Sequence, residues 1–270
     1  MEEFHLHLVS DATGETVQTV ARACLVQFEG AQPTQHIWTL VRNDRQIEEV
    51  IRGIEKNLGF VLFTLVNVEI RNKLQAACHH FQVPCVSVLQ PIMSAFTGYL
   101  QTKEQARPGR QHMLDREYYE RITALDYAMT HDDGQGVWDL EEADVVLVGV
   151  SRTSKTPTCI YLANRGIKAG NIPIVLGMDL PLELLSSKSL LIVGLTNDAR
   201  NLLQVRRNRL RMLNEDDETN YVNPESIAKE VSFAKRLFTQ QNWPVIDISR
   251  RSIEETAAAI IKLRAQRHES

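Results

Sequence analysis

Residues 149 to 156 contain the residue types that bind nucleotide phosphates. In such a loop, backbone N–H groups and the N-terminus of the following helix concentrate partial positive charge, and a lysine adds a full one. An apolar strand pattern leads into this segment and a helix-like pattern leaves it, which is the order that a phosphate-binding loop requires. The candidate loop reads Gly149-Val150-Ser151-Arg152-Thr153-Ser154-Lys155-Thr156.

Lys155 and Thr156 are the residues of this loop that could do chemistry. Lys155 would stabilise the charge of a phosphoryl group, and the hydroxyl of Thr156 is a candidate ligand for Mg²⁺. Ser154 stands where the usual pattern has its second glycine, and a serine tolerates fewer backbone angles than a glycine. The alternative is a chance Lys-Thr pair after a buried strand, but the strand-loop-helix order favours phosphate binding.

Acidic residues at two other places are candidate catalytic groups. Asp132 and Asp133 follow a predicted helix, where their charge is unfavourable unless Mg²⁺ or a phosphoryl acceptor compensates it, and His131 beside them could relay a proton. A solvated turn ended by Gly134 is the alternative. Asp198 follows an apolar strand pattern and could hold Mg²⁺ or orient a nucleophile, although it could equally cap the next helix.

Two further polar segments allow both a functional and a structural interpretation. Residues 11 to 16 follow the first strand and could bind an anion, or Asp11 or Thr13 could simply cap the next helix. An arginine-rich helix could meet phosphate or an acidic partner surface, or it could present a solvated face. Its arginines are Arg206, Arg207, Arg209 and Arg211.

The pattern of apolar residues predicts an α/β fold with parallel strands in two lobes. We place an N-terminal α/β lobe at residues 1–105 and a P-loop nucleotide-binding lobe at residues 106–270, because the polar stretch around Pro108-Gly109 interrupts the apolar pattern. The second lobe is predicted to hold a doubly wound P-loop-type parallel sheet flanked by helices. Strands are predicted at Phe4–Ser10, His36–Val41, Phe60–Val66, Pro84–Leu89, Asp144–Val150, Ile172–Gly177, Leu190–Thr196 and Pro244–Ser249.

Three helices have sequence signals for their ends. One should start at Asp44 and end at Gly59, and a second should begin at Leu114 and run up to His131. The last should start with a capping box formed by Ser252 and Glu255.

Composition excludes several classes of protein. The formal charge of −4 and the isoelectric point near 6.1 argue against a nucleic-acid-binding protein. No basic leader and no long apolar segment is present, so we expect no membrane association and a cytoplasmic location. The four cysteines lack the spacing of a zinc site, and we expect mostly buried thiols.

Four sequence segments together resemble those of the pyruvate, phosphate dikinase regulatory proteins, which are related to the phosphoenolpyruvate synthase regulatory proteins. The likeness spans nearly the whole chain, and Ser154 in the loop favours the dikinase branch. The segments are Phe4 to Thr16, His131 to Gln135, Gly149 to Asn164 and Arg251 to Thr256.

This resemblance implies a bifunctional serine/threonine kinase and phosphorylase. Such proteins phosphorylate a threonine of the dikinase with ADP as donor, and they remove the phosphate with inorganic phosphate to give pyrophosphate. Carried over by position, Gly149 to Thr156 would bind ADP, Lys155 would contact the transferred group and Thr156 would help to hold Mg²⁺ if it is used. The resemblance does not identify the acid-base residue.

Other functions remain open at this point. The chain could regulate phosphoenolpyruvate synthase, it could be a non-catalytic ADP-sensing module, or it could be a small-molecule kinase that uses ATP. A homodimer is compatible with a two-lobed regulator.

Overall fold

The computed structural model describes residues 3–102, 116–187, 189–213 and 220–268. The chain divides into two compact units, residues 1–113 and 114–270, which are described separately below. The boundary that the sequence predicts between residues 105 and 106 lies outside the described residues.

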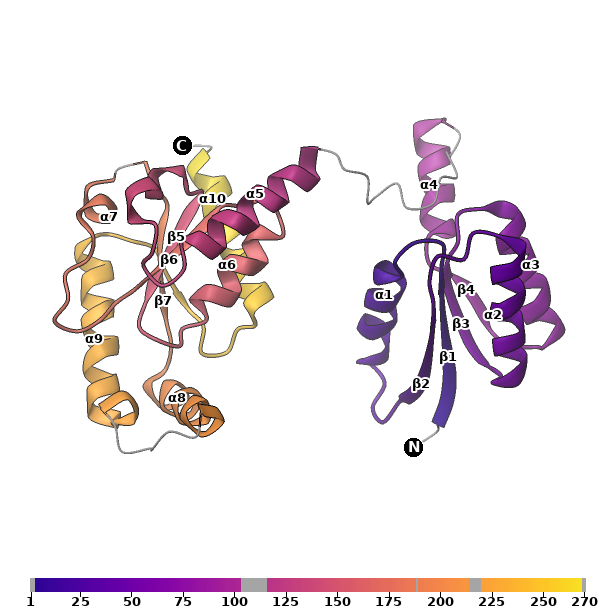
Figure 1. Ribbon diagram of the computed structural model, residues 1–270, viewed down its shortest axis with the longest axis horizontal. Coiled ribbons are helices and arrows are strands. Elements are labelled where there is room, and N and C mark those ends of the chain that lie inside the picture. Colours follow the sequence, from indigo (N-terminus) through magenta and orange to yellow (C-terminus); the bar gives the residue numbers. More distant parts are fainter. Residues whose placement is uncertain (1–2, 103–115, 188, 214–219, 269–270) are drawn as a thin grey trace. The chain divides into compact units, whose positions relative to one another are not determined.

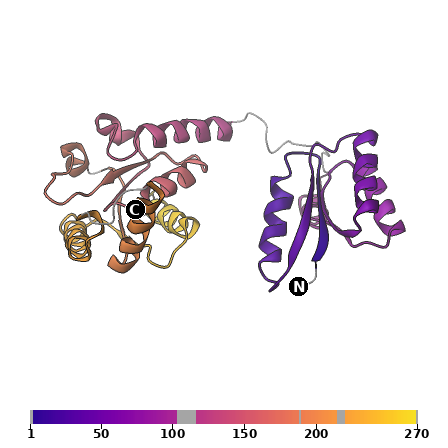
Figure 2. The same ribbon diagram turned by 60° about the horizontal axis from the view of Figure 1, so that its bottom comes forward.

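The N-terminal unit contains a four-stranded parallel sheet with helices on both faces. The strand order is β2-β1-β3-β4, and residues of β1 pair in register with residues of both β2 and β3. Figure 1 shows α1 on one side of this sheet and α2 and α3 on the other, and Figure 2 shows the same separation. The elements are β1 (Glu3–Ser10), α1 (Glu15–Leu25), β2 (Gln32–Trp38), α2 (Asp44–Lys56), β3 (Gly59–Thr64), α3 (Val68–His80), β4 (Cys85–Ser87) and α4 (Gln90–Leu100).

Alternating side chains of β1 explain why helices cover both faces. Leu6 and Leu8 pack with Val17 and Ala21 of α1. Val9 points to the other face and joins a second cluster with residues of α2 and α3. Because side chains alternate along a strand, β1 contributes to two separate apolar cores.

Several predicted element ends in this unit are wrong. The second strand is Gln32–Trp38, not His36–Val41, because it is a partly exposed edge strand whose register is set by pairing with β1 and not by its own apolar content. Helix α2 is capped by the side chain of Asn43, one residue before the predicted Asp44, and it ends before Asn57. Gly59 does not end α2 but begins β3, where a Cβ atom would lie 2.0 Å from the carbonyl oxygen of His5.

Three histidines lie together at one edge of this sheet. His7 is fully buried, and its Nδ1 accepts a hydrogen bond from Trp38 Nε1 at 3.2 Å. Its Nε2 therefore carries the proton and donates it to the carbonyl oxygen of Asn57 at 2.8 Å. His36 stacks on His7 and its Nε2 lies 3.0 Å from His5 Nδ1. Burial lowers the pKa of His7 below its usual value, and the neighbouring His36 and His5 lower it further, against the effect of the Asn57 bond.

The N-terminal unit is therefore expected to lose stability as the pH falls below about 6.5, the usual pKa of histidine. Below that pH the unfolded chain binds a proton at His7 that the folded unit takes up only at lower pH, so acid favours unfolding. Peptide-resolved hydrogen exchange of β1 and β2 at pH 5.5 and 7.5, corrected for intrinsic rates, measures the effect. His79→Gln, a change of an exposed histidine on α3, should keep the full pH dependence. Equal protection at both pH values would contradict the prediction.

The C-terminal unit also has a four-stranded parallel sheet, with the order β6-β5-β7-β8. The predicted doubly wound arrangement is confirmed, because buried residues of helices pack on both faces of the sheet. The elements are α5 (Arg116–Thr130), η2 (Val137–Glu142), β5 (Val145–Gly149), α6 (Lys155–Ala163), β6 (Ala169–Pro173), α7 (Leu182–Ser186), β7 (Ile192–Thr196), α8 (Ala199–Leu213), η3 (Asn220–Val222), α9 (Pro224–Gln240), β8 (Val245–Asp247) and α10 (Ile253–His268).

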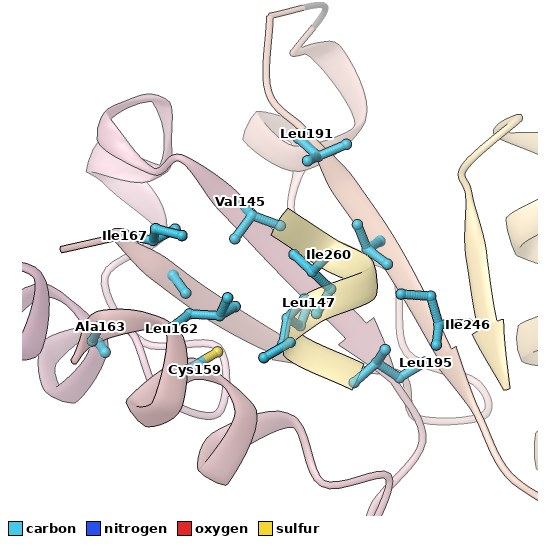
Figure 3. Packing of buried hydrophobic residues seen from close by; sticks show 14 of the residues in the cluster. Val145, Leu147, Cys159, Leu162, Ala163, Ile167, Leu191, Leu195, Ile246 and Ile260 are labelled. Carbon is cyan, nitrogen blue, oxygen red and sulfur yellow. The ribbon is translucent and has the colours of Figure 1, made fainter. Parts of the chain in front are cut away.

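β5 is the centre of this unit. All of its residues are buried, and alternate side chains enter the two cores. Figure 3 shows Val145 and Leu147 on the face covered by α6 and α10, with Cys159, Leu162 and Ile260 against them. The opposite face is covered by α7, α8 and α9. A strand buried on both faces fixes the position of the loop that follows it.

The capping box is confirmed, whereas one strand is displaced from its predicted place. The Ser252 hydroxyl accepts a hydrogen bond from the Glu255 amide, and the Glu255 carboxylate accepts one from the Ser252 amide. The sixth strand is Ala169–Pro173, not Ile172–Gly177, because its limits follow its pairing with β5, which ends at Gly149.

The cysteine prediction is correct for half of the thiols. Cys78 and Cys159 are buried, whereas Cys85 is half-buried and Cys24 is exposed. Within the described parts of the chain, no helix combines the length and apolar character that a membrane span needs.

Candidate functional site

The 149–156 loop lies where the strand order of the C-terminal sheet reverses. β5 lies between β6 and β7. The chain therefore leaves β5 towards β6 on one side, whereas it leaves β7 towards β8 on the other. Crevices at such a point, beyond the carboxyl ends of the strands, are the usual ligand sites of α/β sheets. Gly149 is required here, since a Cβ atom would lie 2.6 Å from the carbonyl oxygen of Leu195. The loop therefore begins at the place where an α/β fold offers a binding site.

The loop folds tightly into the N-terminus of α6. Arg152 and Ser154 have left-handed backbones, with φ of 71° and 54°. The hydroxyl of the fully buried Thr153 donates to the Val150 carbonyl at 2.9 Å. Ser154 is the N-cap residue of α6, but its side chain makes no capping hydrogen bond. The positive end of α6 is thus not neutralised by its own cap, an arrangement suited to an anion.

Ser154→Gly is expected to stabilise the C-terminal unit. A left-handed backbone costs an L-residue about 1–2 kcal/mol, and the greater freedom of glycine in the unfolded chain offsets part of the gain. A net gain of roughly 0.5–1 kcal/mol should raise the melting temperature by about 2–4 °C. Ser232→Gly, in the exposed interior of α9, is the matched control and should lower it. A lower melting temperature for Ser154→Gly in calorimetry would contradict the expectation.

Lys155 is buried at the base of the loop, with only 5% of its surface exposed. Its Nζ donates to the carbonyl oxygens of Gly149 at 3.0 Å and Val150 at 3.2 Å. Burial lowers the pKa of Lys155 to about 8, while Asp133 and, less strongly, Asp132 raise it. Most of the lysine is therefore still charged at neutral pH. The charged ammonium group of Lys155 is thus fixed beside the loop amides, although burial removes most of its hydration.

Asp132 lies directly beside the loop, as a catalytic role would require. Its Oδ1 accepts hydrogen bonds from Thr156 Oγ1 at 2.7 Å and from Asn171 Nδ2 at 2.5 Å. The backbone amide of Asp133 donates to Asn171 Oδ1 at 3.2 Å, so Asn171 holds the Asp132 carboxylate and the Asp133 backbone together. The sequence prediction did not include Asn171, although an asparagine in an otherwise apolar strand was a usable signal. The structure thus brings together Asp132, Asp133, Lys155 and Thr156 from two separate segments.

His131 has a structural environment. Its ring is buried and stacks on Tyr127, with 3.6 Å between the ring centroids. Its Nδ1 lies 2.8 Å from the Tyr127 carbonyl oxygen, and its Nε2 lies 2.7 Å from Asp139 Oδ1. Both ring nitrogens are engaged away from the loop, so the suggested proton relay through His131 finds no support. The histidine instead fixes the turn that carries the two aspartates.

Asp198 acts as the cap of α8, which was the alternative to a catalytic role. Its Oδ1 accepts a hydrogen bond from the amide of Arg200 at 2.8 Å, and its own amide donates to Ser249 Oγ at 2.9 Å. Among the residues that the structure describes, no hydrogen bond joins Asp198 to the 149–156 loop. Its capping role accounts for its position.

The arginines of α8 divide into one buried and three exposed residues. Arg206 is 1% exposed, and its Nη2 lies 2.6 Å from Glu230 Oε2 and 3.3 Å from the carbonyl oxygen of Ser151. The prediction of a solvated face is therefore wrong for Arg206. The spacing of Leu202, Arg206 and Leu210 places it on the buried side of the helix. Arg207, Arg209 and Arg211 are exposed, as a solvated face predicts.

Neither Asp11 nor Thr13 is the N-cap residue of α1. The N-cap residue of α1 is Gly14, with a φ of 84° and no side-chain capping bond. The carboxylate of Asp11 instead accepts a hydrogen bond from the amide of Val66 at 2.8 Å. Burial raises the pKa of Asp11, and this bond lowers it in part. The aspartate ties the first loop to the end of β3.

The chain matches one protein family over nearly its whole length. The model of the family described as Kinase/pyrophosphorylase matches residues 6–261. A relative from Paramagnetospirillum magneticum is 55% identical over 263 residues, covering 97% of this chain and 85% of the relative. A relative from Rhodospirillum rubrum is 50% identical over 262 residues, covering 97% and 95%. Both carry the name "Putative pyruvate, phosphate dikinase regulatory protein". This chain therefore belongs to the kinase/pyrophosphorylase family, together with relatives that carry this name.

Proposed function

We propose that this protein is a bifunctional serine/threonine kinase and phosphorylase that regulates pyruvate, phosphate dikinase. In one direction it transfers the β-phosphoryl group of ADP to a threonine hydroxyl of the dikinase and leaves AMP. In the other, inorganic phosphate takes the phosphoryl group from that threonine and leaves as pyrophosphate. The observation that supports this proposal best is the buried Lys155 at the uncapped N-terminus of α6, beside Asp132 and Asp133. The chain also belongs to a family described as kinase/pyrophosphorylase.

One site can serve both reactions because both pass through similar charge distributions. In each, negative charge spreads over a transferring phosphoryl group between two oxygen atoms. The loop amides and the positive end of α6 are fixed before the reaction, so they stabilise this charge without reorganisation. Lys155 adds its full charge from a buried position, where the interaction is stronger than in water. Gly149 to Thr156 would accordingly bind the phosphates of ADP.

Asp132 is the candidate acceptor of the threonine proton. Its carboxylate is already oriented by Thr156 and Asn171, so it is held in one position beside the loop. Asp133 lies near enough to Lys155 to raise its pKa and thereby helps to keep the lysine charged. We leave Asp198 out of the catalytic group because its carboxylate caps α8.

The residues around Thr156 fit a magnesium ion. Mg²⁺ prefers oxygen ligands and is commonly held by one or two protein groups together with substrate phosphates and water. The Thr156 hydroxyl supplies one such oxygen, and the Asp132 carboxylate, 2.7 Å from it, could bind a water molecule of the ion. In the described residues, no group of three or more His, Cys, Asp or Glu side chains forms a separate metal site. When bound, Mg²⁺ would neutralise part of the phosphate charge, with the Thr156 hydroxyl as its protein ligand.

Incubation of the purified protein and dikinase with ADP labelled at the β-phosphate tests the proposal. Label should enter a threonine of the dikinase, and Lys155→Ala should abolish the labelling. Added inorganic phosphate should then release the label as pyrophosphate. Labelling of phosphoenolpyruvate synthase instead would identify that enzyme as the target. Measured ADP binding without any labelling would favour a non-catalytic sensing module. ATP-dependent transfer to a small molecule would overturn both the kinase and the phosphorylase reaction proposed here.

A further inference from the structure

A buried charge lies beside the 149–156 loop outside the residues used above. The guanidinium of Arg206 contacts three different segments through its terminal nitrogens. Nη2 donates to Glu230 Oε2 on α9 at 2.6 Å and to the Ser151 carbonyl oxygen at 3.3 Å. Nη1 donates to the carbonyl oxygen of Tyr221 at 3.1 Å. Arg206 thus joins α8, α9 and η3 to the backbone of the loop.

Tyr221 extends this contact to the side chains of the loop. The Cζ atom of Arg206 lies 4.7 Å from the centre of the Tyr221 ring. The hydroxyl at the other end of the ring accepts a hydrogen bond from Arg152 Nε at 3.1 Å and lies 3.4 Å from Ser151 Oγ. A continuous series of contacts therefore runs from Glu230 through Arg206 and Tyr221 to Arg152.

The energetics of these contacts indicate that they position the loop and do not mainly stabilise the fold. A buried ion pair adds little net stability compared with apolar residues of similar volume, because both charges lose their hydration. Arg206 Nε has no hydrogen-bond partner among the described atoms, which adds a further cost. What the arrangement does provide is a fixed position for the Ser151 backbone and for the otherwise exposed Arg152 side chain.

We propose that Tyr221, held by Arg206 and Glu230, is a positioning residue that presents the Arg152 guanidinium to phosphate oxygens. This inference rests on the proposed phosphate-binding function of the loop. Arg152 Nε donates to the Tyr221 hydroxyl, so Nη1 and Nη2 of Arg152 are left to donate to the phosphate. Two parallel hydrogen bonds from these nitrogens are the geometry in which arginine binds phosphate. An arginine that is already fixed loses less side-chain entropy when the anion binds.

Tyr221→Phe tests this role, because it removes only the hydroxyl and keeps the ring next to Arg206. Calorimetric titration with ADP and, separately, with inorganic pyrophosphate should show affinities about 3- to 10-fold lower than for the unchanged protein. Tyr161→Phe is the matched control, since Tyr161 also has an arginine over its ring, with Arg165 Cζ at 4.1 Å, but lies on α6 away from Arg152. The control should retain its affinity for both compounds within about 2-fold.

A double-mutant cycle shows whether Tyr221 acts through Arg152. In an Arg152→Ala background, Tyr221→Phe should change the affinity less than about 2-fold, because the group that it positions is gone. An equal loss in both backgrounds, or unchanged affinity of Tyr221→Phe, would overturn the inference even if phosphoryl transfer to the dikinase occurs. If Tyr221→Phe lowers the pyrophosphate affinity only when Arg152 is present, and no phosphoryl transfer is seen, the inference stands and only the proposed function is rejected. If the unchanged protein binds neither compound, the inference is wrong.

Discussion

Lys155→Met is expected to abolish phosphoryl transfer while making the C-terminal unit more stable. Methionine has a similar volume but no charge, so the variant removes the cost of burying an ammonium group that is only 5% exposed. The same change removes the full positive charge that would face the transferring phosphoryl group. Transfer from labelled ADP should fall by about 10³-fold or more, by analogy with the loss of other charge-stabilising groups in phosphoryl transfer. The unfolding midpoint in urea should rise.

The control for this variant is Lys262→Met, which changes an exposed lysine on α10. It should leave both transfer and stability close to those of the unchanged protein. A destabilised Lys155→Met variant would show that the bonds from Nζ to the carbonyl oxygens of Gly149 and Val150 outweigh the burial cost. Substantial remaining transfer would exclude Lys155 from the reaction.

The same lysine gives the unchanged protein two opposite pH dependences. With a pKa of about 8 when folded and 10.5 when unfolded, Lys155 loses its proton first in the folded state. ADP binding should weaken as the pH rises through about 8, because the charge that attracts phosphate disappears. Stability should instead gain a contribution between pH 8 and 10.5, since the unfolded chain binds more protons there. Lys155→Met should lack both effects.

Asp132→Asn is expected to lower the transfer rate by about 10²- to 10⁴-fold with a much smaller effect on ADP affinity. Asparagine has the same shape, and its Oδ1 can still accept the hydrogen bonds from Thr156 and Asn171, so the local geometry should persist. What disappears is the negative charge and the capacity to take the threonine proton. Single-turnover transfer from labelled ADP gives the rate, and calorimetry gives the affinity.

Asp126→Asn, on an exposed position of α5, is the matched control and should transfer at the normal rate. If Asp132→Asn loses ADP affinity and transfer in equal proportion, Asp132 acts in binding the nucleotide or its Mg²⁺ and not as the proton acceptor. A normal rate would remove it from the mechanism altogether.

The parts of the site that are contiguous in sequence could be predicted without the structure. The 149–156 loop is recognisable because strand, loop and helix follow one another, and each has its own local pattern. Asp132 is a candidate from the sequence because two carboxylates at the C-terminal end of a helix are locally unfavourable. The two lobes and their parallel strands follow from alternation of apolar segments along the chain, which is also a local property.

Contacts between distant segments could not be predicted in this way. Asn171 meets Asp132 across 39 residues, and Arg206 meets Ser151 across 55. The sequence does not distinguish Arg206 from its exposed neighbours, because a run of charged residues looks the same whether one of them is buried or not. The edge strands were displaced for a related reason, since their limits depend on pairing with a neighbour and not on their own residues.

The sequence by itself determined that this protein has two α/β lobes, a candidate phosphate-binding loop with one lysine, and acidic residues suited to act beside it, because each of these depends on neighbours along the chain. Only the tertiary structure decided that Asp132 lies against Thr156, that His131 and Asp198 have structural partners instead, and that Arg206 and Tyr221 hold the loop. The physical reason is that burial and pairing of charged groups depend on which segments the two faces of a sheet bring together.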